Sequence, residues 1–156
     1  MISFASDPAR YLPHRTPMLL LDTIVAADET SARCRVTVGE QCALFHEADG
    51  SYPNSLFIEF MAQTVGVYAG IRDSLSNIGS RVGFLLGSRN IKLSKKKIFS
   101  GDVYDIDAHC IFFGEEALPS QFECRVLEKD TEVAAAVLTV YRPRNLDEFV
   151  RETIQK

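Results

Sequence analysis

Hydrophobic residues fill almost every position of one stretch of the chain, residues 54–71, which reads NSLFIEFMAQTVGVYAGI. A stretch that is apolar on nearly all sides predicts a helix buried inside the protein. We expect this helix to begin with Asn54 as its N-cap, to run to about Leu75 and to stop at residues 77–79. Glu59 is the only ionisable side chain of the stretch, and burying its carboxylate is costly unless the group is paired, hydrogen-bonded or protonated.

Most other hydrophobic residues alternate with polar ones, which is the pattern of half-buried strands. Residues 32–38 show it clearly, with Ala, Cys and two Val on one side against two Arg and Thr on the other. We expect further strands at residues 19–27, 82–93, 102–113, 121–128 and 132–141, and an amphipathic helix in the tail, residues 145–156. Because several strands follow the long helix in succession, the order favours an antiparallel α+β layer over a doubly wound parallel sheet.

The long helix needs apolar cover on all sides, whereas a curved sheet wrapped around it covers only one side. A second protomer is the simplest source of the remaining cover. We therefore expect a single α+β domain over residues 1–156, with a curved antiparallel sheet around a long central helix. The assembled form is expected to be a dimer.

Composition narrows the class of protein. With 156 residues, 46% of them hydrophobic and 24% charged, the chain has the composition of a globular domain. No apolar run is long enough to span a bilayer, and the start MISFASDPAR lacks the features of a signal peptide, so we expect a cytoplasmic protein. The net charge of −4 disfavours general binding to nucleic acids. Because no CxxC pair is present, a metal site is not expected, and the cysteines are expected to be reduced core residues: Cys34, Cys42, Cys110 and Cys124.

One histidine suggests chemistry. His46 precedes a turn-like segment, residues 47–54, that leads into the predicted helix. An imidazole beside a loop and a lone carboxylate in a buried helix can act together as a general acid/base pair. The alternatives are a loop histidine without a chemical task and a Glu59 paired for structural reasons with an arginine or a backbone group. We interpret His14, in a proline-bounded segment, and His109, in a strand pattern, as structural.

Positive charge is concentrated in one part of the chain. The basic run consists of five residues between positions 89 and 97: Arg89, Lys92, Lys95, Lys96 and Lys97. Such a run is commonly a solvated edge, and it can also be a docking patch for an acidic partner or a phosphate. Charge alone leaves both interpretations open.

Three stretches resemble one enzyme family. Residues 12–22, LPHRTPMLLLD, are similar to the opening motif of the hotdog-fold β-hydroxyacyl-(acyl carrier protein) dehydratases, and residues 53–63, PNSLFIEFMAQ, to the motif of their central helix. Residues 82–105, which contain GFLLG, resemble the strands that follow. The family's His-Phe-Pro-Gly loop is replaced by HEADG at residues 46–50, and its glycine at the helix start by Asn54. These departures indicate a divergent branch similar to the ApeP-like dehydratases of aryl-polyene clusters.

The resemblance implies a hotdog fold and the dehydration of (3R)-hydroxyacyl thioesters to trans-2-enoyl thioesters, in fatty acid, polyketide or aryl-polyene biosynthesis. It assigns His46 as the base at the α-carbon. It assigns Glu59 as the acid for the departing hydroxyl, or as the group that holds the leaving water, with the two residues coming from different subunits. The thioester oxygen is expected at backbone N–H groups near Asn54 and Ser55, where the helix dipole favours negative charge. No metal or cofactor is implied, since the substrate is carried on a phosphopantetheine arm.

The same resemblance implies partners and an acyl channel. The partners are an acyl carrier protein and a second subunit, either an identical chain or a related dehydratase. A carrier protein is acidic, which favours the docking interpretation of the basic run. The acyl chain is expected beside Glu59, where a stripe of polar and small residues on the helix also fits simple close packing. The channel candidates are Gln63, Gly66, Gly70 and Phe84.

Two other functions are left open. A thioesterase on the same fold uses a carboxylate to activate water, and a non-catalytic subunit shapes the site of a related dehydratase. The presence of both His46 and Glu59 favours the dehydratase over the thioesterase.

Overall fold

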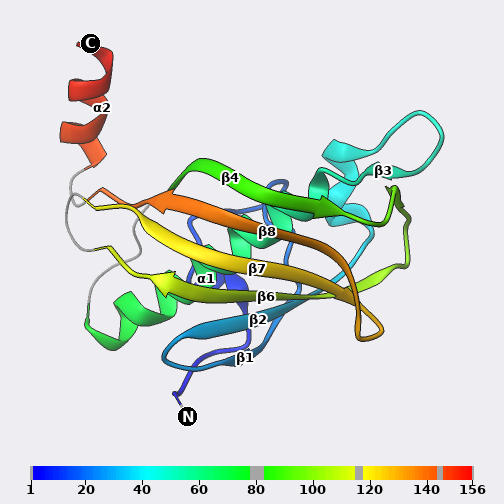
Figure 1. Cartoon of the computed structure of the whole chain (residues 1–156), viewed down its shortest axis with the longest axis horizontal. Helices are drawn as coiled ribbons and strands as arrows, with labels where there is room; N and C mark the ends of the chain where they lie inside the picture. The colour runs from blue at the N-terminus through cyan, green and yellow to red at the C-terminus, as the bar shows by residue number, and fades with distance from the viewer. Residues whose placement is uncertain (1, 78–82, 115–117, 144–145, 156) are drawn as a thin grey trace.

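Helix α1 (Leu56–Leu75) lies across one face of a six-stranded sheet that curves around it (Figure 1). The structure is a computed structural model that describes residues 2–77, 83–114, 118–143 and 146–155. Neighbouring strands of the sheet run antiparallel in the order β1-β2-β6-β7-β8-β4. The prediction of an antiparallel α+β layer around a long central helix is therefore confirmed.

The strands form where apolar and polar residues alternate, because successive side chains of a strand point to opposite faces. In β2, buried Cys34 and Val36 alternate with Arg33 and Arg35. The strands of the sheet are β1 (Thr23–Ala27), β2 (Ser31–Thr37), β4 (Phe84–Leu93), β6 (Val103–Phe112), β7 (Ser120–Glu128) and β8 (Thr131–Tyr141). The other described elements are the short pair β3 (Tyr52–Pro53) and β5 (Lys97–Ile98), the 3-10 helices η1 (Pro8–Arg10) and η2 (Glu40–Phe45), and helix α2 (Leu146–Ile154).

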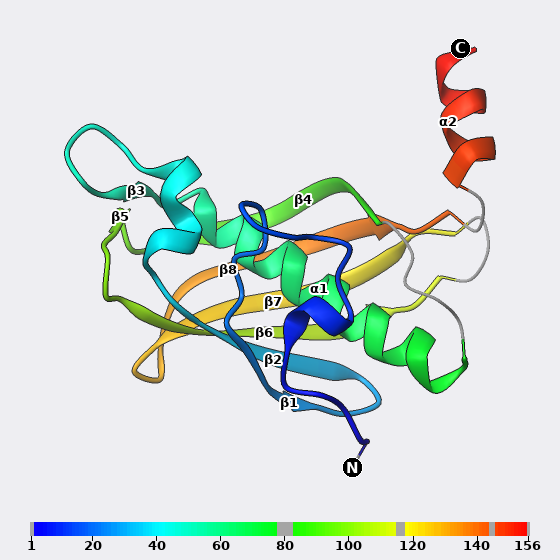
Figure 2. The ribbon, with the colours of Figure 1, turned by 180° about the vertical axis from the view of Figure 1, so that it is seen from behind.

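Two layers cover α1, the sheet on one side and the N-terminal segment on the other (Figure 2). Toward the sheet, the buried Phe57 packs edge to face on Tyr104 of β6, with ring centroids 5.0 Å apart. Toward the N-terminal segment, Gly70 lets the backbone of Tyr11 approach. A Cβ atom at Gly70 would lie only 2.4 Å from the Tyr11 carbonyl oxygen. The N-terminal segment, residues 2–22 before β1, therefore supplies cover that the sheet does not reach.

One face of α1 stays only partly covered in a single chain, as expected for a helix whose remaining cover is predicted to come from a second protomer. Ile58, Glu59, Ala62 and Gly66 are only half-buried, and their spacing places them on one side of the helix. Hydrophobic burial of the remaining helix is extensive. The prediction that a second protomer supplies the missing cover fits this face, and it stays a prediction.

Strand β4 forms one edge of the sheet and exposes apolar side chains. Leu85, Leu86 and Ile91 are 45%, 58% and 48% exposed. An unpaired strand edge with apolar side chains is a template for pairing with another chain. The edge of β4 is therefore a second surface suited to a partner subunit.

The first predicted strand is shorter than expected, because a side chain of α1 binds the backbone before it. β1 begins at Thr23 instead of residue 19. The Gln63 side-chain oxygen accepts a hydrogen bond from the Leu20 N–H at 3.0 Å, and its Nε2 donates to the Met18 carbonyl at 2.8 Å. These backbone groups are satisfied by the helix and not by a neighbouring strand.

The start of α1 also differs from the prediction. The N-cap position is Ser55 and not Asn54, and no side chain caps the helix there. The Asn54 side chain instead donates to the Lys95 carbonyl at 3.2 Å. At the other end, the helix stops after Leu75 as expected, while residues 78–79 of the predicted stop and the start of the next predicted strand, residue 82, lie outside the described residues.

None of the helices that the structure describes is both long enough and apolar enough to cross a bilayer.

Candidate active site

Glu59 lies in the first turns of α1, on the uncovered face of the helix. Its side chain is half-buried and not enclosed as the sequence suggested. Gln63, one turn later and only 1% exposed, donates from Nε2 to Glu59 Oε1 at 2.9 Å. Because Gln63 is itself fixed by Met18 and Leu20, the carboxylate of Glu59 is held in one orientation.

A cavity of about 220 Å³ opens beside Glu59 along this face of the helix. The N-terminal segment, the start of β4 and the end of β8 form its other walls. Its lining is mainly apolar with a few polar groups, which is the usual composition of a small-molecule site. Lining residues include His14, Glu59, Gln63, Gly66, Leu85 and Arg142.

Two of the four acyl-channel candidates line this cavity and two do not. Gln63 and Gly66 are on its wall, whereas Gly70 packs against the backbone of Tyr11. Phe84 is also absent from the wall, which takes Gly83 and Leu85 instead. Neighbouring residues of an extended chain point to opposite sides, so Phe84 faces away when its neighbours face the cavity.

His14 is a cavity residue that the sequence interpretation missed. We expected a structural histidine without a carboxylate nearby, yet His14 and Glu59 line the same cavity. The Nδ1 atom of His14 is buried and has no hydrogen-bond partner among the residues that the structure describes, which is costly for a polar atom. Its place in the opening motif was the one available sign, because the two residues are too far apart in sequence for spacing to reveal their common cavity.

His46 follows η2 and is exposed. Its imidazole makes an edge-to-face contact with Tyr52, with ring centroids 5.3 Å apart, and no hydrogen bond that the described residues provide. In particular, His46 and Glu59 of one chain do not bind each other. The loop after His46 leads through β3 directly into α1, so both residues belong to the same end of the helix.

Free backbone donors lie at the start of α1. The N–H groups of Ser55 and Leu56 donate no hydrogen bond within the described chain, while the Asn54 and Ser55 carbonyls accept from Phe57 and Ile58. The first N–H groups of any helix lack intrahelical partners, and together with the helix dipole they attract negative charge. The predicted oxyanion position is therefore supplied with donors.

The basic run is divided between internal contacts and solvent. Lys95 binds Asp102, Tyr104 and Glu128, each at 2.8 Å. Lys97 forms an ion pair with Asp49. Of the others, Arg89 reaches Gln121 at 3.5 Å, and Lys92 and Lys96 are exposed and make no ion pair with a described residue. Lys95 and Lys97 therefore have partners within the chain, and the docking role of the basic run stays a prediction.

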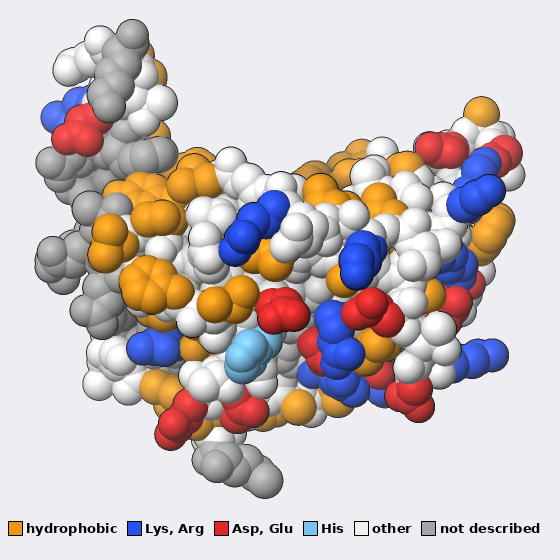
Figure 3. Space-filling model, in the orientation of Figure 1, with side chains coloured by type: hydrophobic (Ala, Val, Ile, Leu, Met, Phe, Trp, Pro, Cys, Tyr) orange, Lys and Arg blue, Asp and Glu red, His pale blue; other side chains and the backbone are white. Residues whose placement is uncertain are grey.

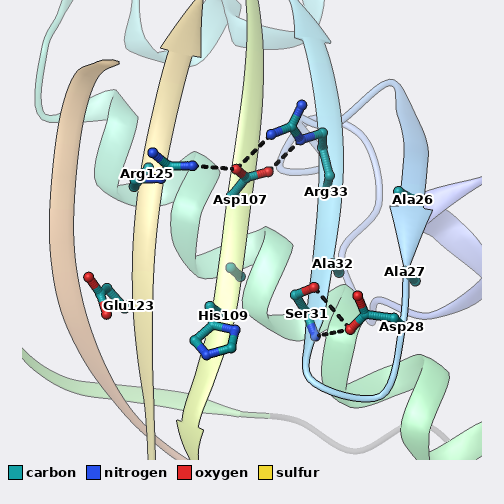
Figure 4. A pocket seen from close by; sticks show the side chains of 11 residues that line it. Ala26, Ala27, Asp28, Ser31, Ala32, Arg33, Asp107, His109, Glu123 and Arg125 are labelled. Carbon is teal, nitrogen blue, oxygen red and sulfur yellow. Dashed lines mark hydrogen bonds and ion pairs between the residues drawn. The ribbon is translucent and has the colours of Figure 1, made fainter. Parts of the chain in front are cut away.

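A larger groove of about 500 Å³ lies on the outer face of the sheet, opposite α1 (Figure 4). Asp107 binds Arg33 at 2.5 and 2.8 Å and Arg125 at 3.2 Å across neighbouring strands. The hydrogen bond from Arg33 to Asp107 raises the pKa of that guanidinium. His109 stands opposite Glu123 in the strand register, in keeping with its structural interpretation.

This outer face mixes acidic and basic side chains, and its apolar side chains gather toward the end where α2 begins (Figure 3). The charged side chains of the groove pair with one another, as Asp107 does with Arg33 and Arg125, and such exposed ion pairs contribute little to stability. The cavity on α1 instead holds Glu59 on its wall, so we place the candidate active site there and not in the outer groove.

The cysteines are poor candidates for nucleophiles. All four are free, and Cys34 and Cys124 are fully buried. Burial raises the pKa of both thiols to about 12, so their reactive thiolates do not form near neutral pH.

Comparison with known proteins places the chain among dehydratases. A family model described as ApeP dehydratase matches residues 6–151. The 3-hydroxyacyl-(acyl-carrier-protein) dehydratase FabZ of Bartonella henselae is 32% identical over 129 residues, which cover 80% of each chain. FabZ of Psychrobacter arcticus is 29% identical over 138 residues, 85% of this chain and 91% of the relative.

A solved structure is similar over the full length. It is the dehydratase heterocomplex ApeI:P from Xenorhabdus doucetiae, one chain of which matches with a TM-score of 0.90 and 29% identity. The match covers 99% of this chain and all of the other. The PaaI protein of Escherichia coli, at 17% identity and a TM-score of 0.56, shares the fold alone.

Proposed function

The chain belongs to the ApeP-like branch of the hotdog-fold dehydratases, and from this membership we propose that it acts in the dehydration of (3R)-hydroxyacyl thioesters carried on an acyl carrier protein. The product is the trans-2-enoyl thioester, and water is released. The observation that carries the proposal is the cavity on α1 with Glu59 on its wall. The N–H donors at the start of the same helix, outside the lining of the cavity, add to it. We propose fatty acid, polyketide or aryl-polyene biosynthesis as the context, which the ApeP family model supports.

The proposed reaction is a pair of proton transfers. The neutral imidazole of His46 removes a proton from the α-carbon, and the electrons of that C–H bond form the new double bond as the bond to the β-hydroxyl breaks. Protonated Glu59 gives its proton to the departing hydroxyl, which leaves as water. Each transfer of this kind contributes about 10²- to 10⁴-fold to a rate.

Negative charge that develops on the thioester oxygen is bound at the start of α1. Backbone N–H groups of Ser55 and Leu56 are available, and preorganised donors of this kind are among the largest contributions to catalysis. Asn54 need not contribute its side chain, which binds the Lys95 carbonyl. Proton transfers and backbone donors require no metal ion or redox cofactor.

The complete site is proposed to form between two subunits. His46 is exposed and has no hydrogen bond to Glu59 of its own chain. Its imidazole is therefore accessible to Glu59 of the partner subunit. The half-buried face of α1 and the apolar edge of β4 are the surfaces available for that neighbour. The second subunit is an identical chain or a related dehydratase.

The acyl carrier protein is proposed to dock on the exposed cations of the basic run, Lys92 and Lys96 with Arg89. Electrostatic docking acts mainly on the association rate and weakens with salt. The substrate arm then delivers the thioester to the helix start.

One assay tests the activity and separates it from hydrolysis. Purified protein is incubated with a 3-hydroxybutyryl or crotonyl thioester, and both enoyl absorbance and free thiol are followed. A change in enoyl absorbance without thiol release supports dehydration, whereas release of thiol identifies a thioesterase. If neither signal appears with the protein alone or with a related dehydratase added, the proposal is wrong.

A second candidate role is that of a subunit in a mixed dehydratase. The full-length similarity to a chain of the ApeI:P heterocomplex favours this alternative. In that case the protein alone is inactive, and activity appears only with the related subunit. Single variants at His46 and Glu59, tested in that mixture, identify the chain that supplies each group.

A further inference from the structure

Residues 95–98 contact both parts of the chain that carry candidate catalytic groups. We call residues 95–98 the positioning segment. Its β5 part pairs with β3, in the register Tyr52 with Ile98 and Pro53 with Lys97. β3 lies between the loop of His46 and the start of α1, so this pairing ties both to one support (Figures 1 and 2).

The first link runs from Lys97 to the loop of His46. Its Nζ pairs with Asp49 Oδ2, three residues after His46. The other carboxylate oxygen, Oδ1, accepts hydrogen bonds from the Ser51 N–H at 3.0 Å and the Ser51 hydroxyl at 2.6 Å. These bonds, with that from Lys97 the largest, hold the pKa of Asp49 below its ordinary value. One carboxylate thus closes the turn and fastens it to β5.

The backbone of this loop depends on the same turn. The Glu47 N–H donates to the Ser51 carbonyl at 2.8 Å, and Gly50 adopts a φ of +87°, which favours glycine. The backbone N–H of His46 donates to the Ala43 carbonyl at 3.3 Å, and among the described residues its imidazole makes the one ring contact with Tyr52. The direction of the imidazole is therefore set by the loop, and the loop is fixed by Asp49.

The second link runs from Lys95 to the helix start. The Lys95 carbonyl accepts from the Asn54 side chain at 3.2 Å, next to the free N–H of Ser55. The Lys95 ammonium group is anchored by Asp102, Tyr104 and Glu128. Burial alone would lower the pKa of Lys95, but these three hydrogen bonds outweigh burial and raise it. Lys95 thus holds the Asn54 side chain with its backbone carbonyl, while its own side chain is anchored to β6 and β7.

We infer that the positioning segment orients the His46 loop and the helix start for catalysis, and that Lys97 acts as a positioning residue through Asp49. The inference rests on the proposed function for the roles of His46 and the helix start. It differs from the docking interpretation, which assigns Lys95 and Lys97 to an external partner. Under the docking interpretation, loss of Lys97 affects only a carrier-bound substrate. Under the positioning interpretation, it affects a short pantetheine thioester equally.

The test compares Lys97→Gln with Lys129→Gln, since Lys129 is an exposed lysine in the turn between β7 and β8 and makes no ion pair with a described residue. We expect Lys97→Gln to lower kcat roughly two- to fivefold, the range of one exposed ion pair, with KM nearly unchanged. The loss is expected to be equal on a pantetheine thioester and on a carrier-bound substrate. Lys129→Gln is expected to leave kcat on both substrates at the wild-type value, and Lys97→Arg to restore most of the loss.

Asp49→Asn provides a second route to the same contact. Asparagine keeps an oxygen that can accept from Ser51 and removes the charge that binds Lys97. We expect it to match Lys97→Gln, and the double variant to lose no more than either single one, because both break one interaction. A loss confined to the KM of the carrier-bound substrate, or additive losses, would overturn the inference.

Hydrogen–deuterium exchange of residues 46–52 gives a readout that needs no activity. Faster exchange in Lys97→Gln than in Lys129→Gln supports the positioning segment, even if the wild-type protein proves inactive and the proposed function fails. Equal exchange in the two variants overturns it, even if the protein is an active dehydratase.

Discussion

The strongest test of the shared site uses two variants that are each inactive. His46→Ala removes the base, and Glu59→Gln removes the acid while keeping the size of the side chain. Both are expected to fold, because His46 is exposed and Gln63 can still donate to an amide oxygen at position 59. Thermal unfolding and size-exclusion chromatography check this expectation.

The size of the loss follows from the proposed chemistry. A general acid or base contributes about 10²- to 10⁴-fold, so each single variant is expected to lose that much in kcat. The double variant is expected to lose little more than the worse single one, since both groups act on one transition state. Near-wild-type turnover in either single variant would remove that residue from the mechanism.

Mixing the two variants then tests the geometry. If His46 of one subunit works with Glu59 of the partner subunit, half of the randomly exchanged dimers are mixed, and each mixed dimer keeps one intact site. About a quarter of the wild-type activity is therefore expected to return. Mixing His46→Ala with the double variant is the matched control, because it creates no intact pair. Verified subunit exchange without recovery would refute a site shared between identical chains.

Three further outcomes are expected from the structure. Gly70→Ala should destabilise the fold by about 1–3 kcal/mol, because the new Cβ would meet the rigid Tyr11 carbonyl. Gly66→Ala should destabilise it less, since its Cβ meets only the movable tip of the Leu12 side chain, and urea unfolding compares the two variants. His14→Leu should gain about 1 kcal/mol of stability, because it removes a buried nitrogen that has no hydrogen-bond partner among the described residues; an unchanged or lower stability in urea unfolding would count against this reasoning. Lys92→Glu with Lys96→Glu should raise KM for a carrier-bound substrate at low salt and leave a pantetheine substrate unaffected; equal effects on both substrates would identify another role.

The helix and the sheet were predictable because each follows from local periodicity. A twenty-residue helix with few polar residues and strands with strict alternation are strong patterns, and their order alone favoured the antiparallel layer. The start of β1 at Thr23 instead of residue 19 was not predictable. It depends on Gln63, which binds the backbone at Met18 and Leu20 from more than forty positions away. The same distance in sequence hid the common cavity of His14 and Glu59.

The basic run shows a different limit of sequence analysis. Charge density identified five cations, but their function depends on which acids lie nearby in space. Asp49 is brought to Lys97 by the pairing of β3 with β5, and Glu128 is brought to Lys95 from the end of β7. Neither pairing has a local pattern, since β3 and β5 are two residues long. The spacing of like charges therefore could not distinguish a docking patch from an internal support.

The resemblance to the dehydratases rested on two main stretches, residues 12–22 and 53–63, and these stretches form a single unit in space. Gln63 binds the backbone at Met18 and Leu20 while it holds the carboxylate of Glu59. Displacing the N-terminal segment would leave a buried amide unsatisfied and release Glu59 together with one wall of the cavity. The opening stretch is thus part of the candidate site itself, and this explains physically why neither stretch suffices alone to build it.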